Sequence, residues 1–447
     1  MIPILITAAA LALAPQDSTR LTLGDAVDRA LGAHPSVAAA RATADAASAE
    51  IGQARAAWLP AVSLDGAVSK FQKPMVVYPL HALDLRNPPL FDTELSQASI
   101  GAAYTLFDFG ARRAKVRAAE SQREAAGAVL SATEQQLATR TIGAFLRVLT
   151  ARGVLAADDQ RVAALSAEAK RARDRFAAGK SARVDTLRAA SELTGAIADR
   201  VNSAATVEMA EHDLARLIGA APGSLRNASL APVRLVSVRA AKATAAAQAA
   251  DARTSGNPQG NADVMAAARR ADAATASVGS AKAARLPQFN ATTALVDRSN
   301  ITGRWQSEWQ VGVGVSWPVF TGGARESAIA RAQATARAAQ EQLRLARLNA
   351  DQQVDEAQAA FAAASARAAA LDAAVQQAAE VARITALARD VGEGTQTEYL
   401  LAESLLYRVR SSLVQARHAM IGARVELARA QGELTRHWMT ISLEPQP

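Results

Sequence analysis

Side chains that usually catalyse reactions or hold metals are few in this sequence and stand far apart. It has no cysteine, so thiolate nucleophiles, thiolate metal sites and disulfides are excluded. The histidines show no HExxH or HxH spacing; they are His34, His81, His212, His418 and His437. A metal site could arise only if folding brought distant ligands together. We therefore expect no catalytic residue, no metal and no cofactor, and hence no enzyme.

The string GVGVSW (312–317) has alternating glycines, as some phosphate-binding loops do, but its surroundings favour a strand. A dinucleotide loop needs a helix start and an acid further on, and the string has neither. Apolar residues instead share one parity over about the length of a bilayer-crossing strand, namely Trp305, Trp309, Val311, Val313, Val315, Trp317 and Val319. A soluble antiparallel sheet with one buried face is equally compatible with this alternation.

The formal net charge of +8 raises the class of nucleic-acid-binding proteins. Basic and acidic residues alternate along helical segments such as SAEAKRARDRF (166–176), a pattern typical of solvated helix faces. We therefore expect no nucleic-acid partner. A basic cluster at a helix start is compatible with contacts to anionic lipid headgroups or with a solvated face, and comprises Arg112, Arg113, Lys115 and Arg117.

Two copies of one unit make up most of the sequence. A shift of 213 places Phe107 on Phe320 and Gly179 on Gly392, without a gap. Residues 34–60 match residues 261–287 at a shift of 227. The difference of 14 falls between positions 60 and 104, where the first copy has a longer, proline-rich loop. Each copy reads as a helix, two strands, a long helix, a turn and a returning helix.

The helices are expected to form antiparallel coiled-coil hairpins. No proline interrupts residues 111–177 or 324–390, and a helix of this length would extend roughly 100 Å. Apolar residues recur at spacings of seven, four and three, as in coiled-coil seams, and abundant alanine allows close helix approach. After glycine-containing turns, the returning helices are expected at 183–219 and 396–436.

The expected organisation follows the repeat. It comprises a signal peptide at 1–14, repeat 1 at 21–219 with a β-hairpin at about 60–107, a linker at 220–260 with one short helix near 239–252, repeat 2 at 261–436 with a β-hairpin at about 287–320, and a tail at 437–447. No later segment has about 18 uninterrupted apolar residues, so we expect no helical membrane span. Four strands cannot close a membrane barrel, whose smallest forms have about eight strands, whereas a trimer would supply twelve.

Several strings together resemble the TolC-type outer membrane efflux protein family. They are HPSVAAARATADAASAEIGQARAAWLP (34–60), TLFDFGARR, WPVFTGGAR, FAAGKSARVDTLRAA and VGEGTQTEYLLAE. The resemblance implies a mainly α fold with a transmembrane β part, in which a homotrimer builds one twelve-stranded barrel and a long periplasmic α-barrel. It also implies an exit duct in the outer-membrane lipid that docks to a periplasmic adaptor protein and an inner-membrane pump.

The resemblance also assigns roles to individual residues. Asp185 and Glu398 match acids that narrow the periplasmic entrance, although Leu401 replaces a second acid. Phe176 is kept in the first copy, whereas Arg389 stands at the matching place in the second, where an aromatic residue is expected. Adaptor contact would fall to Gly179, Lys180, Ser181, Gly392, Gly394 and Thr395. Ordinary turn and capping chemistry is the alternative reading of these positions.

Aromatic residues of the strand regions, and glycines where strands give way to helices, form a further group of candidates. Tyr104, Trp305, Trp309 and Trp317 fit interfacial aromatic belts, and the junction glycines are Gly110, Gly322 and Gly323. We expect an outer-membrane exit duct, gated at its periplasmic tip, that serves a tripartite efflux or type I secretion system. The alternative function is a periplasmic coiled-coil adaptor or scaffold, which would have one hairpin flanked by small β domains.

Overall fold

The computed structural model describes residues 20–77, 86, 91–226, 228–235, 261–300, 303 and 305–445. The expected signal peptide and the short helix near 239–252 lie outside these residues. The chain divides into two compact units. The sheet unit comprises residues 40–130 and 263–347, and the hairpin unit comprises the other described residues. None of the helices within the described ranges is long and apolar enough to cross a membrane.

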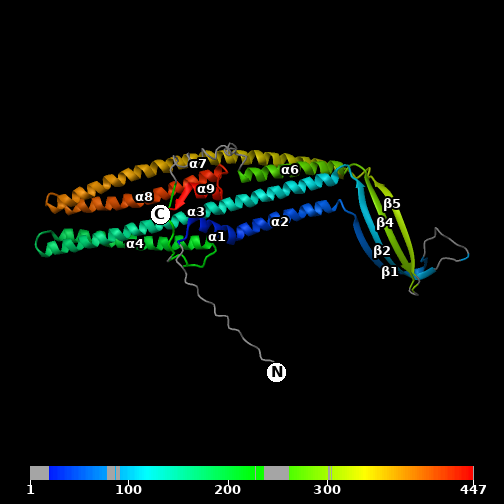
Figure 1. Cartoon of the computed structure of the whole chain (residues 1–447), viewed down its shortest axis with the longest axis horizontal. Helices are drawn as coiled ribbons and strands as arrows, with labels where there is room; N and C mark the ends of the chain where they lie inside the picture. The colour runs from blue at the N-terminus through cyan, green and yellow to red at the C-terminus, as the bar shows by residue number, and fades with distance from the viewer. Residues whose placement is uncertain are drawn as a thin grey trace, which may run out of the picture. The chain divides into compact units, whose positions relative to one another are not determined.

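The sheet unit contains one antiparallel four-stranded sheet in the order β1-β2-β4-β5 (Figure 1). Its strands are β1 (Ala61–Val76), β2 (Phe91–Phe107), β4 (Gln288–Ser299) and β5 (Trp305–Ser316). Each repeat contributes one hairpin, and β2 pairs with β4 between the repeats. The helices α2 (Pro35–Ala56) and α6 (Ala262–Ala283) precede the two hairpins in the chain.

The apolar face of this sheet is exposed. Val68 of β1 is 82% exposed and Val313 of β5 is 71% exposed. Val62, Leu64, Val311 and Val315 on the same parities are also exposed. A soluble sheet with one buried face requires these side chains to be covered within the chain. A continuous exposed apolar face instead suits contact with lipid hydrocarbon.

Two long helical hairpins dominate the hairpin unit. One is α3 (Ala111–Ala177) with α4 (Arg183–Leu217), and the other is α7 (Ala324–Asp390) with α8 (Gln396–Ala430). Residues 111–130 of α3 and 324–347 of α7 belong to the sheet unit. Their turns lie at the same end of this unit (Figure 1). Alanine forms much of the helix contact, as where α7 and α8 meet at Ala378, Ala382, Ala402 and Leu406. Small side chains let the helix axes approach closely, so the contact surface is thin but extensive.

The returning helices are shorter than the sequence pattern suggested. The expectation of a helix continuing to 436 is wrong, because α8 ends at Ala430. Gly432 has a φ of 73°, a conformation that leaves the helix. The N–H of Glu433 then donates to the carbonyl of Ala428 at 2.8 Å. In the first copy α4 ends at Leu217, and Gly219 follows with a φ of 68°.

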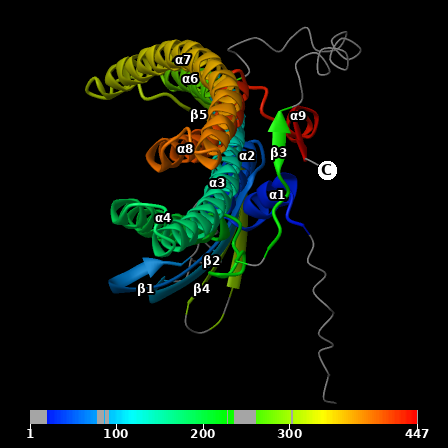
Figure 2. The same ribbon diagram turned by 90° about the vertical axis from the view of Figure 1, so that its left-hand side faces the viewer.

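Short elements occupy residues that were expected to be linker and tail. They are β3 (Val233–Leu235), α9 (Arg436–Ser442) and β6 (Leu443–Pro445), and β3 pairs with β6. Figure 2 shows α1 (Leu23–Ala33), β3 and α9 gathered together in the hairpin unit. Burial of Val233 and Leu443 stabilises this pairing. The sequence did not predict these elements because three-residue strands and a seven-residue helix are too short to show a clear period.

One partly buried contact predicts a pH dependence of stability. The hydroxyl of Thr150 on α3 donates to the carbonyl of Leu146, so Nδ1 of His418 on α8 donates to that hydroxyl at 2.7 Å. Burial and then the charge of Arg417 lower the pKa of His418 below 6.5. The unfolded chain therefore binds more protons than the folded chain as pH falls through 6.5, and stability decreases. We expect a lower thermal unfolding midpoint by circular dichroism at pH 5 than at pH 7.5. The decrease should be smaller in His418→Gln; an equal decrease would contradict this assignment.

Candidate functional site

The two hairpin turns bring most of the predicted site residues to one end of the hairpin unit. Gly179 and Gly392 have φ values of 71° and 86° and end the long helices. A side chain at Gly394 would stand 3.0 Å from the Cβ of Ala388 and from the N of Arg389, so this turn requires close backbone approach. Gly179, Lys180, Gly392 and Thr395 are exposed, and Ser181 is half-buried. The turns therefore form a small exposed surface at this end of the unit.

The carboxylate of Glu398 has a defined local role. It accepts from the backbone N–H of Thr395 at 2.9 Å, while the hydroxyl of Thr395 accepts from the N–H of Glu398 at 3.2 Å. This reciprocal capping box begins α8. Hydrogen bonds with the backbone and the side chain of Thr395 hold the pKa of Glu398 below its usual 4.5. Asp185 lies in the first turn of α4, after Ala182, which provides no capping side chain. Only the second tip therefore uses its acid as a cap.

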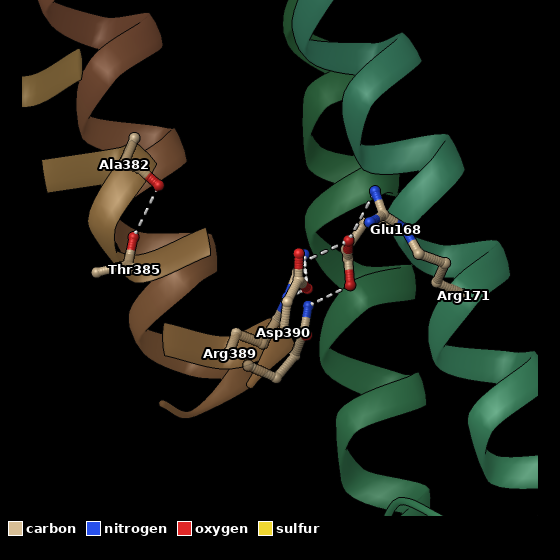
Figure 3. A network of polar contacts seen from close by, with 7 residues as sticks. Glu168, Arg171, Ala382, Thr385, Arg389 and Asp390 are labelled. Carbon is tan, nitrogen blue, oxygen red and sulfur yellow. Dashed lines mark hydrogen bonds and ion pairs between the residues drawn. The ribbon is translucent and has the colours of Figure 1, made fainter. Parts of the chain in front are cut away.

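Arg389 lies at the centre of a buried polar cluster that joins three helices (Figure 3). Its Nη1 donates to Oε2 of Glu168 at 2.9 Å, and its Nη2 donates to Asp390 at 2.7 Å. The amide of Gln396 donates to the other oxygen of Glu168 at 2.8 Å. The guanidinium also lies 4.0 Å from the ring centre of Tyr399. Glu168 belongs to α3 and Arg389 to α7, so the cluster connects the two hairpins.

Two members of this cluster, Arg389 and Glu168, are charged and shielded from water, whereas the side chain of Asp390 is exposed. The side chains of Arg389 and Glu168 are 6% and 5% exposed. Burial opposes the charge on Arg389, but its hydrogen bond to Asp390 and the charges of Glu168 and Asp390 together raise its pKa. The same bond lowers the pKa of Asp390. Glu168 also forms an ion pair at 3.3 Å with Arg171, whose side chain is exposed. Removing one partner from a buried pair costs about 3–5 kcal/mol where the other charge is left uncompensated.

Two further contacts connect the hairpins near the tip. Arg188 of α4 donates to the hydroxyl of Thr397 on α8 at 2.9 Å. Leu165, Ala196 and Leu400 form an apolar cluster of α3, α4 and α8. Phe176 is 45% exposed.

Sequence reasoning located Arg389 and Phe176 but missed Glu168, Gln396 and Tyr399. The motif Thr-x-x-Glu at 395–398 could have revealed the cap. No pattern in the sequence predicts that Arg389 pairs with Glu168, which lies 221 positions earlier in the chain.

The first strand–helix junction contains a second buried ion pair. Arg112 donates to Asp108 at 3.0 Å, and both side chains are less than one-tenth exposed. The guanidinium of Arg112 also lies 4.3 Å from the ring centre of Trp58. Arg112 is therefore neither a headgroup contact nor part of a solvated face, as had been considered. At the shift of 213 the second copy has Thr321 in place of Asp108.

The predicted interfacial aromatics differ in exposure. Trp305, Trp309 and Trp317 are 54%, 75% and 57% exposed, whereas Tyr104 is half-buried. The indole N–H of Trp317 donates to the carbonyl of Arg285 at 3.2 Å. Positive φ values occur at the junction glycines, at 85° for Gly110, 61° for Gly322 and 81° for Gly323. Among the described residues, no three acids or histidines are grouped so that they could hold a metal ion.

Comparison with known proteins identifies the chain's family. Residues 26–220 and 258–433 match a family described as outer membrane efflux protein. The chain belongs to this family. This efflux protein is 27% identical to outer membrane efflux protein BepC of Brucella suis over 392 residues, which are 86% of this chain and 79% of BepC. Its TM-score to the outer membrane protein VceC of Vibrio cholerae is 0.76 at 22% identity, covering 92% and 96% of the two chains. For the open state of the MtrE outer membrane channel of Neisseria gonorrhoeae, these values are 0.74, 21%, 93% and 90%.

These findings establish what the efflux protein does at the level of its family. It is an outer-membrane channel of the kind that serves tripartite efflux or secretion systems, and it extends into the periplasm. The expected mainly α fold with a transmembrane β part is confirmed. The alternative of a periplasmic adaptor is wrong, because the chain has two long hairpins and matches channels along most of its length. Members of this family are channels and not enzymes.

Proposed function

We propose that three copies of this efflux protein form a passive exit duct whose periplasmic tip is gated by the buried pair of Glu168 and Arg389. The pair connects the α3–α4 hairpin to the α7–α8 hairpin at the tip. A gate needs two packings separated by a few kcal/mol. Breaking a buried ion pair supplies an energy of this size. This pair is the observation that carries the proposal.

The acids near the tip would set the ion preference of the duct. Asp185 and Glu398 each lie in the first turn of a returning helix, so three copies would present six carboxylates. Leu401, where the family resemblance implies another acid, is 66% exposed and uncharged. We therefore propose one acidic ring at the entrance. A ring of carboxylates favours cations over anions.

The exposed turns would be the docking surface for a periplasmic adaptor, with an inner-membrane pump beneath it. The tip residues already described as exposed support this assignment, because a turn with few internal contacts can adapt to a partner. The exposed apolar face of the sheet, with Trp305 and Trp309 on β5 and Trp317 directly after it, would meet outer-membrane lipid. We propose no nucleic-acid partner. Opening would follow when the adaptor and pump bind the open packing more tightly than the closed one.

Assembly and conduction test this function directly. Light scattering in mild detergent is expected to give the mass of three chains. Insertion of that species into a planar bilayer is expected to give discrete single-channel currents. A monomer of about one chain mass, without channel activity, would overturn the proposal.

A further inference from the structure

Both edges of the described four-stranded sheet are strands without an in-sheet neighbour on one side. The sheet order places β1 at one edge and β5 at the other. An exposed edge presents unpaired N–H and C=O groups and readily pairs with another chain. A trimeric duct, which the proposed function requires, would bring β5 of one copy beside β1 of the next. The open point is which residues meet across that seam.

The pairing of strands is the same in the two internal repeats. In the first hairpin Ala61 pairs with Ala103, and in the second Gln288 pairs with Ser316. Adding 227 to each β1 number and 213 to each β2 number converts one pair into the other. The same shifts convert every pair from Ala61 to Lys70 in the first hairpin into an observed pair of the second. The two hairpins therefore have the same register.

The pairing of β2 with β4 joins the second strand of repeat 1 to the first strand of repeat 2. The free edges are the second strand of repeat 2 and the first strand of repeat 1. We propose that β5 of one copy pairs with β1 of the next copy in the register that the β2–β4 pairing dictates. The two shifts convert Gly101 opposite Ala294 into Gly314 opposite Ala67 of the next copy.

The resulting seam uses residues 65–70, within the regular part of β1. Ile100 opposite Leu295 becomes Val313 opposite Val68 of the next copy, and the seam extends from Ser316 opposite Asp65 to Val311 opposite Lys70. Beyond Lys70 the pairing of β1 with β2 becomes irregular, so the register is assigned only to these six pairs. Equal stagger at every strand interface is what closure into one barrel requires.

The exposed apolar side chains support this register independently. Val68 and Leu64 share one face of β1, and Val311, Val313 and Val315 share one face of β5. In the proposed register these two apolar faces coincide. A slip by one residue would turn one of them to the opposite side of the sheet. A slip by two would keep the faces together but break the equal stagger.

The absence of cysteine makes disulfide crosslinking a clean test. The matched variant combines Gly314→Cys with Ala67→Cys. A Cβ atom added at Gly314 would have no atom of another residue close by within the chain, so the cysteine fits without a clash. Residues directly opposite have Cα atoms about 4.5–5.5 Å apart, within the roughly 4.4–6.8 Å that disulfides need. Val313→Cys with Val68→Cys tests the adjacent pair, which has the alternate hydrogen-bonding geometry. Within one chain, positions 67 and 314 lie at least about 14 Å apart, because β1 and β5 are three strand spacings apart, and cannot be bridged.

Two controls bracket the matched variant. Gly101→Cys with Ala294→Cys is its intramolecular equivalent and should crosslink within one chain, which shows that the sheet forms and oxidises. Gly314→Cys with Ser69→Cys is the slipped variant, whose residues would be diagonal and about 7–8 Å apart. Denaturing gels without reductant should show covalent trimers for at least one matched variant, and at least tenfold less for the slipped variant.

The outcomes separate the register from the assembly. If a variant is trimeric by light scattering but the slipped pair crosslinks as well as the matched pairs, the register is wrong and the proposed function stands. If both matched pairs stay unlinked while the intramolecular control oxidises, the register is also overturned. If every variant and the unmodified chain are monomeric, the assembly itself fails. Reductant must return each covalent trimer to single chains.

Discussion

Replacing Arg389 with methionine is expected to make the channel leak. The change leaves Glu168, which is 5% exposed, as a buried charge whose only remaining cationic partner among the described residues is the exposed Arg171 at 3.3 Å. Such a loss costs about 3 kcal/mol or more. If the pair separates when the tip opens, this energy is removed from the closed packing alone. The ratio of open to closed channels should then rise about a hundredfold, measured as open probability in planar bilayers without adaptor or pump.

A second substitution separates the charge from the link itself. Arg389→Met combined with Glu168→Gln removes both charges, so no buried charge remains uncompensated. Stability of the tip should recover by more than half relative to Arg389→Met alone. The channel should nevertheless remain leakier than the unmodified protein, because the link between α3 and α7 is absent. Heat stability of the trimer and open probability report these two effects separately.

The matched control is Arg417→Met. Arg417 of α8 bonds to Asp372 of α7, and both side chains are about half exposed. This pair lies within one hairpin and cannot link the two. An exposed pair contributes about 1 kcal/mol or less. We expect unchanged conductance in Arg417→Met; a leak equal to that of Arg389→Met would show that any lost arginine opens the tip, and the gating role would be refuted.

Removing the charges of Asp185 and Glu398 is expected to abolish cation preference. The variant combines Asp185→Asn with Glu398→Gln, so both side chains keep their size. Glutamine serves in a capping box as glutamate does, so the start of α8 is retained. The reversal potential under a salt gradient should move from the cation side to near zero. Glu398→Ala should give a similar shift for that site but also lower the stability of α8, because it removes the cap.

The pH dependence and a neighbouring acid sharpen this test. Hydrogen bonds from Thr395 hold the pKa of Glu398 below 4.5, so its carboxylate stays charged at pH 5. Cation preference should therefore persist at pH 5 and decline only below 4.5.

Glu393 provides a control, because it lies in the turn outside the returning helix and is exposed. Glu393→Gln should leave the reversal potential nearly unchanged; if it abolishes selectivity, the acidic ring is not the selecting element.

Periodic features were predictable from the sequence because they depend on backbone geometry alone. The alternation in β5 marks a strand, whose side chains repeat every two residues. The shifts of 213 and 227 reappear as the register of both hairpins. The lack of proline in residues 111–177 and 324–390 agrees with the bounds of α3 and α7. The short pairing of β3 with β6 left no comparable pattern.

The candidate site was only partly predictable, and its charges show why. The cap made by Thr395 and Glu398 is local, since a helix start always brings these two positions together. Arg112 was misjudged as a surface charge because its burial depends on Trp58, which comes from a different helix-end segment. The partner of Arg389 depends on which helices pack at the tip.

The sequence by itself therefore determined the two-copy plan, the apolar face of the strands and the positions of the turns. Each of these follows from contacts between residues near in sequence or from a repeated pattern. Only the tertiary structure decided that Arg389 meets Glu168 and that Arg112 is buried with Asp108. An ion pair between distant helices depends on a rotation and an axial offset that no local pattern encodes. Such a pair becomes strong only once packing has excluded water from it.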